Sequence, residues 1–251
     1  MSRHLLVIGG QRCGTTTLHG LLDAHPEIAM ARPVRPEPKV FCSDGATERG
    51  VDWYRATYFA HATEGQLLGD KSTSYIEDPR APERAGRMLG TPTILALLRD
   101  PIDRAVSNWR FSTDNGFESR PLEVALRENL TRSVAWDPSA TSVSPFAYLE
   151  RGRYADYLTP WLDRFPRTSQ VSFLDDLVAG TDGIARLYAA IGVAPVDTGA
   201  VPRLNGSTSP AAQLPAELIG QLRDYYARSD ADLARLVGRT PPWATSIRST
   251  P

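Results

Sequence analysis

The sequence predicts an α/β protein: a central parallel sheet with helices on both faces, in one domain that spans residues 1–251. Short apolar segments bounded by loop residues alternate along the chain with longer segments in which apolar residues recur every three or four positions. Strands that alternate with helices form a parallel sheet covered on both faces. A chain of 251 residues, 41% of them hydrophobic, is long enough to bury one large core.

Each strand is expected where a short apolar run ends in loop residues, and each helix where the apolar period changes to three or four. The expected strands are His4–Gly9, Glu27–Ala31, Gln66–Asp70, Thr93–Arg99 and Ser169–Leu174. The expected helices are Thr15–Ala24, Asp52–Phe59, Ala81–Met88, Ile102–Asn115, Leu122–Asn129, Tyr154–Arg164, Gly183–Ile191 and Pro215–Val237. Two segments rich in proline and polar residues, Ala31–Ser43 and Thr131–Pro145, are expected to be substrate loops at the carboxyl ends of the strands.

The composition excludes several functional classes. A formal net charge of -1 argues against a general nucleic-acid-binding protein. The two cysteines, Cys13 and Cys42, are too few for a disulfide framework and stand in no metal-ligand spacing, so we expect no metal. The chain has no apolar run long enough to span a membrane, and its first strand leaves no room for a signal peptide. We therefore expect a cytoplasmic location; the composition leaves the oligomeric state open.

The segment 5–18 carries the most chemical information. It predicts a buried strand, a tight glycine-bearing loop and the first turn of a helix, an arrangement that directs backbone N–H groups and a positive helix dipole at a bound anion. Gly9 and Gly14 have the spacing of the ATP-binding loop G-x-x-x-x-G-K-[ST], but Thr15 replaces its lysine and Arg12 supplies the cation instead. The loop is therefore predicted to bind a phosphate or sulfate other than the γ-phosphate of ATP.

A second segment follows the fourth expected strand. The strand delivers Arg99 to its carboxyl end, Asp100 is the expected N-cap of the next helix, and Pro101 is its first residue. Ser107 lies two turns into that helix, so Arg99 and Ser107 can contact one phosphate. The alternative is that Arg99 pairs with Asp100 or Asp103 and that Ser107 is merely exposed.

Together these segments resemble the sulfotransferases that use 3′-phosphoadenosine 5′-phosphosulfate (PAPS). Residues 11–16 are similar to that family's P-x-S-G-T-T-like loop, which holds the 5′-phosphosulfate, and residues 99–107 match its R-D-P-x-x-R-x-x-S segment, which holds the 3′-phosphate. Three further segments resemble, in order, the K-E-x-H-F-F, E-K-[ST]-P-x-Y and C-terminal segments of the heparan sulfate and related Golgi-type sulfotransferases and their bacterial relatives: Pro36–Phe41, Gly69–Tyr75 and Leu236–Trp243. The resemblance covers nearly the whole chain.

The resemblance implies that PAPS is the sulfuryl donor and adenosine 3′,5′-bisphosphate the product. The residues implied to hold the donor are Arg12, Cys13, Gly14, Thr15, Thr16, Thr17, Arg99 and Ser107, with Arg203, Asn205, Gly206 and Ser207 in a later loop. Arg12 and Lys71 would supply positive charge near the sulfate and the bridging oxygen, and Glu37 would be the general base. The residues expected to bind the acceptor, a hydroxyl of a small molecule or carbohydrate, are Lys39, Asp44 and Tyr154.

Three departures from the family pattern bear on the acceptor. Lys39 stands where these relatives have histidine, and Pro36 replaces their lysine before the glutamate. The disulfide-closed loop of the Golgi-type members is also missing. The loss of that loop favours a soluble bacterial-type enzyme over one that acts on a polysaccharide.

Alternatives remain at the level of single residues and of function. Glu37 also fits a surface glutamate between Arg35 and Lys39, in which case His25 or Asp44 is the next candidate base. The alternative functions are a small-molecule kinase on the same scaffold and a nucleotide-binding protein that has lost catalysis. The missing loop lysine argues against the kinase, and the presence of all three expected catalytic side chains argues against lost catalysis.

Overall fold

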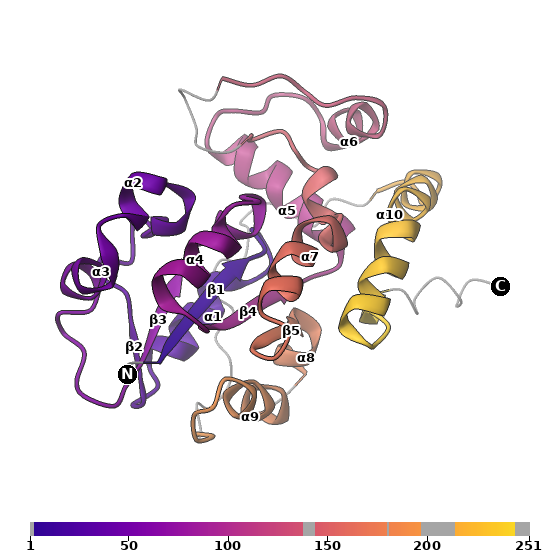
Figure 1. Cartoon of the computed structure of the whole chain (residues 1–251). Coiled ribbons are helices and arrows are strands. Elements are labelled where there is room, and N and C mark those ends of the chain that lie inside the picture. The colour runs from indigo at the N-terminus through magenta and orange to yellow at the C-terminus, as the bar shows by residue number, and fades with distance from the viewer. Residues whose placement is uncertain (1–2, 138–143, 180, 197–213, 244–251) are drawn as a thin grey trace. The chain divides into compact units, whose positions relative to one another are not determined.

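The computed structural model describes residues 3–137, 144–179, 181–196 and 214–243 (Figure 1). It consists of two compact units: Met1–Leu98 with Tyr157–Asn205, and Arg99–Asp156 with Gly206–Pro251. The first unit contains a parallel sheet flanked by helices, which confirms the predicted α/β class. The extent of the domain, predicted as 1–251, stays a prediction.

The sheet of the first unit has five strands in the order β2-β3-β1-β4-β5, and every neighbouring pair is parallel. The strands are β1 (His4–Gly9), β2 (Ile28–Met30), β3 (Leu67–Lys71), β4 (Thr93–Leu98) and β5 (Ser169–Phe173). All five were predicted, with ends that differ by at most one residue. From the central β1 the chain first goes to one edge and then, through β4, to the other. Ligands of open α/β sheets bind outside the carboxyl ends of the strands where the order reverses in this way.

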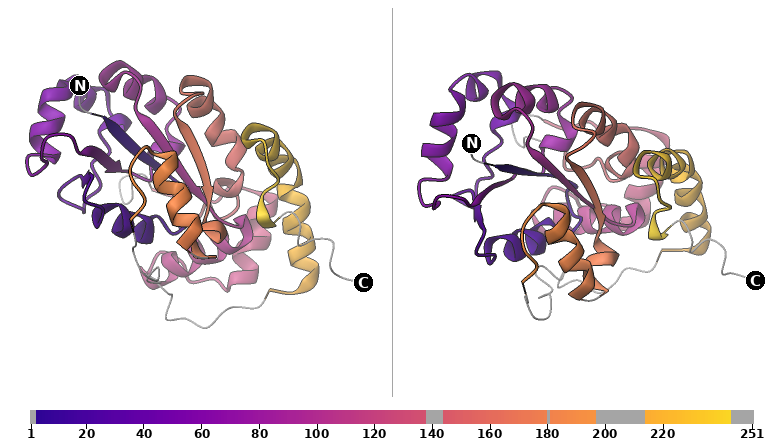
Figure 2. Two further views of the ribbon diagram at one scale, coloured as in Figure 1. Left: turned by 90° about the horizontal axis from the view of Figure 1, so that it is seen from below. Right: turned by 60° about the horizontal axis from the view of Figure 1, so that its bottom comes forward.

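Helices cover both faces of this sheet. Those of the first unit are α1 (Thr15–Asp23), α2 (Asp44–Thr47), α3 (Gly50–Tyr58), α4 (Ala81–Leu89), most of α7 (Tyr154–Arg164), α8 (Leu174–Val178) and α9 (Thr181–Ala190). Alternate residues of the central strands, such as Leu5, Val7 and Leu95, pack in one apolar cluster with side chains of α1 and α9. Helices α4 and α7 lie on the opposite face (Figures 1 and 2). Both sides of the sheet are therefore buried, as the continuous apolar runs predicted.

The second unit is helical. It contains α5 (Pro101–Asp114), α6 (Leu122–Thr131) and α10 (Ala216–Val237), together with a 3₁₀ turn, η3, at Glu150–Gly152. One apolar cluster joins the three helices, and its members include Ile102 of α5, Leu126 of α6 and Tyr226 of α10. Asp100 is the N-cap of α5 and accepts a hydrogen bond from the backbone N–H of Ile102 at 2.8 Å, with Pro101 as first residue. The predicted start of this helix is confirmed.

Four short elements were not predicted in the first unit: α2, α8, and the 3₁₀ turns η1 (Val40–Cys42) and η2 (Tyr75–Glu77). Each has five residues or fewer, so none completes the apolar period on which sequence-based assignment of helices depends. The only local signal at α2 is Ser43, whose side chain caps the helix by accepting from the backbone N–H of Ala46. η1 lies inside the predicted loop Ala31–Ser43, which is otherwise irregular.

Two glycines shape the loop between β1 and α1. Gly9 lies beside Ile76, and a Cβ placed on it would be 2.8 Å from that side chain. Gly14, with a φ of 86°, is the N-cap of α1, and a Cβ there would be 2.8 Å from Leu174 of α8. A left-handed backbone costs a non-glycine residue about 1–2 kcal/mol. The loop therefore needs glycine at Gly14 both for its φ and for its packing.

We predict that Gly14→Ala lowers the free energy of unfolding by more than about 2 kcal/mol, because strain and overpacking add. Gly65→Ala is the control: its φ of 88° is nearly the same, but nothing lies within 4 Å of the added Cβ. Gly65→Ala should lower the free energy of unfolding by only about 1–2 kcal/mol. Chemical denaturation of both variants measures the difference, and equal losses would show that Leu174 does not restrict this position.

Candidate active site

The first turn of α1 is suited to an anion. Gly14 provides no side-chain cap, and the first turn contains no acidic residue, so no side chain of that turn neutralises the positive end of the helix dipole. Thr15 is buried, whereas Thr16 and Thr17 are partly exposed. Arg12, at the tip of the loop, has a positive φ of 66°. The predicted sequence of strand, loop and helix is confirmed, and its backbone fits a bound phosphate or sulfate.

Glu37 and Lys71 form a shielded charged pair in the first unit. Lys71, the last residue of β3, places its Nζ 2.6 Å from Glu37 Oε1. Thr73 donates to Glu37 Oε2 from its backbone N–H at 2.9 Å and from its hydroxyl at 3.0 Å. The Glu37 side chain is 17% exposed and that of Lys71 10%, so both are largely shielded from solvent. The structure thus brings together two of the three residues predicted to be catalytic and assigns Glu37 a defined position rather than a free surface one.

The two candidate acceptor residues of the first unit are anchored in different ways. Lys39 has a left-handed backbone, with a φ of 49°, and its N–H donates to Ser72 Oγ at 2.9 Å. Asp44 pairs with Arg84 Nε at 2.8 Å and with Arg80 at 2.9 Å. The hydrogen bond from Arg84 lowers the pKa of Asp44, which makes it a weaker base. Contact of either residue with an acceptor stays a prediction.

The structure assigns His25 a structural role. Its Nδ1 accepts from the backbone N–H of Glu27 at 3.1 Å, so its Nε2 carries the proton and donates to the carbonyl of Ala194 at 2.8 Å. With both ring nitrogens occupied and the side chain buried, His25 is a poor alternative base. Cys13 is also fully buried, as expected of a small residue that fills space inside the loop.

In the second unit, Arg99 and Tyr154 lie together. Arg99 Nη2 is 3.2 Å from Asp103 in an exposed i,i+4 ion pair. Tyr154 is buried and donates its hydroxyl to the carbonyl of Arg99 at 2.8 Å, so it supports the segment predicted to bind the donor. Ser107 is partly buried on α5. The alternative pairing of Arg99 with Asp103 is therefore present. Such exposed pairs contribute only about 0–1 kcal/mol.

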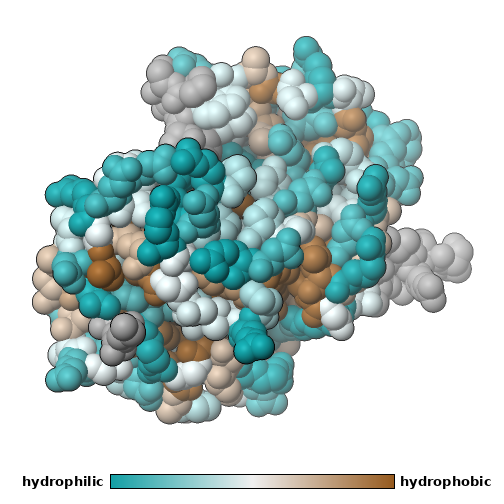
Figure 3. Space-filling model, viewed as in Figure 1, coloured by the Kyte–Doolittle hydropathy of each residue, from teal (hydrophilic) through white to brown (hydrophobic). Residues whose placement is uncertain are grey.

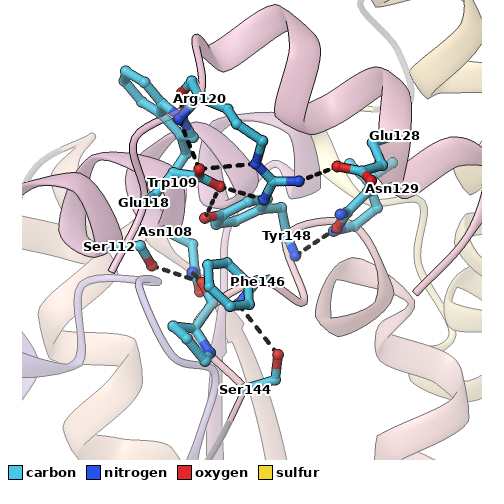
Figure 4. Close-up of polar contacts among 12 residues, drawn as sticks. Asn108, Trp109, Ser112, Glu118, Arg120, Glu128, Asn129, Ser144, Phe146 and Tyr148 are labelled. Carbon is cyan, nitrogen blue, oxygen red and sulfur yellow. Dashed lines mark hydrogen bonds and ion pairs between the residues drawn. The ribbon is translucent and has the colours of Figure 1, made fainter. Parts of the chain in front are cut away.

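A polar network that sequence reasoning missed holds the end of the segment Thr131–Pro145 (Figure 4). Glu118, whose side chain is 2% exposed, pairs with Arg120 at 2.6 Å and accepts from the hydroxyl of Tyr148 at 2.9 Å. Ser112 donates to the carbonyl of Pro145 at 2.6 Å, and Asn129 accepts from the backbone N–H of Tyr148 at 2.9 Å. Apart from the neighbouring Glu118 and Arg120, these partners come from separate stretches of sequence, so no local spacing signals them.

Some predicted residues lie outside the described part of the chain: Arg203, Asn205, Gly206 and Ser207. In the ranges that the structure does describe, no helix is both long enough and apolar enough to span a bilayer. The face seen in Figure 3 carries mostly hydrophilic side chains, with apolar residues in small separate groups.

A family model for the sulfotransferase domain matches residues 2–175. The chain belongs to this family of sulfotransferases, and the resemblance predicted from its motifs is confirmed. The match extends from β1 through β5, so it includes the loop after β1, the Glu37–Lys71 pair and the Arg99–Ser107 segment.

Two curated proteins and one solved structure illustrate the likeness. Mouse heparan sulfate glucosamine 3-O-sulfotransferase 3A1 is 27% identical over 95% of this chain and 63% of its own length. The bifunctional heparan sulfate N-deacetylase/N-sulfotransferase 1 of Caenorhabditis elegans is 29% identical over 68% of this chain and 19% of its own. The chain thus spans less than two thirds of these relatives. A crystal structure of a sulfotransferase from Alicyclobacillus acidocaldarius shares the fold, with a TM-score of 0.75, 20% identity, and coverage of 95% of this chain and 97% of that one.

The Glu118 network predicts a dependence of stability on pH. Burial acts to raise the pKa of Glu118, but hydrogen bonds from Arg120 and Tyr148 outweigh it and hold the pKa below its usual value. Glu118 should therefore stabilise the fold fully above the unfolded-state pKa of about 4.3, and this contribution should be lost as the pH falls through the lower folded-state pKa.

Glu118→Gln should lower the free energy of unfolding by about 1.5–3 kcal/mol at pH 7, the range for hydrogen bonds to a charged group. The difference from wild type should shrink below about pH 4. Glu123→Gln, which removes an exposed partner of Arg127 on α6, is the control and should cost at most about 0.5 kcal/mol. Denaturation curves at several pH values test this. A difference that does not change with pH would contradict the role given to the Glu118 charge.

Proposed function

We propose that the protein transfers a sulfuryl group from PAPS to a hydroxyl of a carbohydrate or small-molecule acceptor. Membership of the sulfotransferase family supports the reaction class. The observation that carries the assignment of residues is the shielded pair of Glu37 and Lys71 at the carboxyl end of β3, in a sheet whose β1 loop is suited to an anion. A carboxylate and a cation held at this edge are the groups that in-line transfer between two oxygens requires.

Glu37 would be the general base. A carboxylate has about four lone-pair positions. Two donors from Thr73 occupy the lone-pair positions of Oε2, and Lys71 occupies one position of Oε1. The second lone-pair position of Oε1 is left for the acceptor hydroxyl. Glu37 would accept the proton of the acceptor hydroxyl there as the new S–O bond forms. Lys71 and Arg12 would neutralise the oxygen that leaves with the phosphate, which lowers the barrier to breaking the old S–O bond.

The donor would be held by two groups of residues. Gly14 and the threonines that follow it would bind the 5′-phosphosulfate through backbone N–H groups and hydroxyls. Arg99 and Ser107 would bind the 3′-phosphate, the arginine after exchange of its exposed partner Asp103. Adenosine 3′,5′-bisphosphate would be the product, and no step described here uses a metal.

The relatives support a carbohydrate acceptor, because the two curated proteins are named for heparan sulfate. Acceptor choice would depend on the loop Ala31–Ser43, which carries Lys39 beside the proposed base, and on Thr131–Pro145. A mass-spectrometric screen of carbohydrate and small-molecule acceptors for sulfate gained from PAPS identifies the class. A cytoplasmic location stays a prediction.

One comparison separates this proposal from its alternatives. Thermal stabilisation by adenosine 3′,5′-bisphosphate but not by ATP would exclude a kinase, because only the bisphosphate carries the 3′-phosphate. Sulfate transfer in the acceptor screen would exclude a nucleotide-binding protein without catalysis. Stabilisation by ATP alone would overturn the proposal.

We predict that Arg99→Ala weakens binding of adenosine 3′,5′-bisphosphate by roughly 1.5–3 kcal/mol, the range for a lost charged hydrogen bond. Binding of adenosine 5′-phosphate should hardly change, because it lacks the group that Arg99 contacts. Asp103→Asn is the control. It removes the competing carboxylate and keeps the arginine, so it should not lower the affinity for either nucleotide. Calorimetric titration measures all four affinities. If Arg99→Ala weakened both nucleotides equally, the 3′-phosphate assignment would be wrong.

Glu37→Gln keeps the shape of the side chain and removes the base, so kcat should fall at least about a hundredfold. Affinity for adenosine 3′,5′-bisphosphate should stay near wild type, since Glu37 is proposed to face the acceptor. Glu64→Gln, an exposed glutamate in the turn before β3, is the matched control and should retain wild-type kcat. Rates are measured with an acceptor from the screen. A wild-type kcat in Glu37→Gln at every pH measured would refute the assignment of Glu37 as the general base.

A further inference from the structure

A buried carboxylate that the proposed reaction does not use lies next to Lys71. Asp70 is 0% exposed, and three hydroxyl groups donate to it: Tyr75 at 2.7 Å and Tyr54 at 2.9 Å, both to Oδ2, and Ser72 at 2.8 Å to Oδ1. Burying an isolated charge costs free energy, so a buried carboxylate usually stays ionised only where several hydrogen-bond donors surround it. These three hydrogen bonds all converge on the Asp70 carboxylate, and we therefore ask which function the ionised side chain serves.

The position of Asp70 follows from the alternation of side chains along a strand. Lys71, the last residue of the strand, and Thr73, two residues beyond its end, both donate to the carboxylate of Glu37. Asp70 and Ser72 lie on the buried side and bond to each other. One short segment therefore contacts the proposed base on one side and the core on the other.

Ser72 connects the two sides. Its hydroxyl proton goes to Asp70, so its oxygen accepts from the backbone N–H of Lys39 at 2.9 Å. Lys39 is two residues beyond Glu37, and its left-handed backbone is an unfavourable conformation that surrounding contacts must hold. Asp70 thereby orients a side chain that bonds to this end of the Glu37 loop next to β3.

We propose that Asp70 is a positioning residue, which acts through Ser72 and Lys39 to hold the carboxylate of Glu37 against Lys71 and Thr73. This inference rests on the proposed function, since it assigns Asp70 to the placement of that reaction's base. Asp70 touches neither donor nor acceptor in this role. Its loss should therefore lower kcat and leave the nucleotide sites intact.

The role predicts a pH dependence. Desolvation raises the pKa of Asp70 to about 6, although its three hydrogen bonds act in the opposite direction. Above this pH Asp70 is ionised and accepts all three protons; below it the carboxyl carries a proton of its own, and the link to Ser72 weakens. The groups that interact electrostatically with Asp70 are Tyr54 and Tyr58 of α3, Tyr75 of η2, Cys42 of η1 and Glu37 of the loop.

Asp70→Asn and Ser72→Ala test the inference with PAPS and an acceptor that the wild-type protein sulfates. Both should lower kcat by roughly 10- to 100-fold, the scale of a misplaced catalytic group. Affinity for adenosine 3′,5′-bisphosphate should change less than about threefold. The part of the wild-type decrease in kcat that occurs near pH 6 should be absent in Asp70→Asn. Ser72→Ala keeps Asp70 itself and still reports on the link if Asp70→Asn does not fold.

Tyr54→Phe is the matched control. It also removes one hydrogen bond from Asp70 but leaves the Ser72–Lys39 link, so it should lower the melting temperature while kcat stays within about twofold of wild type. If Ser72→Ala retained wild-type kcat, or Tyr54→Phe lost as much kcat as Ser72→Ala, the positioning role would be overturned and Asp70 would be structural only. Absence of sulfate transfer by the wild-type protein would instead overturn the proposed function, and this inference with it.

Discussion

The alternation of side chains at the carboxyl end of β3 is the constraint on which the candidate site depends. Consecutive residues of a strand point to opposite sides, so Lys71 reaches Glu37 while Asp70 reaches the buried interior. Ser72 and Thr73 directly follow the strand, and their hydroxyl groups donate to Asp70 and Glu37 respectively. A shift of one residue would exchange these sides and bury the lysine. The parallel register of β3 with β1 fixes the alternation, because Val7 pairs with Lys71.

The charged groups of this region are stabilised by partners rather than by exposure to water. Lys71 neutralises Glu37, hydroxyl groups satisfy Asp70, and two carboxylates and the carbonyl of Phe41 surround Arg84, whose side chain is 6% exposed. Removing one partner of a buried pair costs far more than the pair contributes, because the other charge is left unsatisfied. This explains how a proline-rich loop without long regular structure can hold a carboxylate in a defined place.

In the second unit, polar side chains likewise hold the start of α5 through ion pairs and hydrogen bonds. Arg223 of α10 pairs with Asp100, the N-cap of α5, at 3.0 Å, and Tyr154 bonds to the carbonyl of Arg99. Gly152 leaves space that Pro101 and Tyr226 fill. The start of α5 is thus supported by the C-terminal helix and by the turn before α7. In both units polar groups outside the proposed ligand contacts hold the segments that carry those contacts.

The sequence by itself determined the elements and their order, because apolar periodicity, helix caps and loop motifs are local signals. It predicted all five strands, the loop before α1, the Asp100–Pro101 start of α5 and the sulfotransferase resemblance. Only the tertiary structure decided which polar groups meet. Glu37 and Lys71 are 34 residues apart, and the ring of His25 bonds to a carbonyl 169 residues away. No local period encodes such contacts, since they arise when parallel strands bring distant loops to one edge of the sheet.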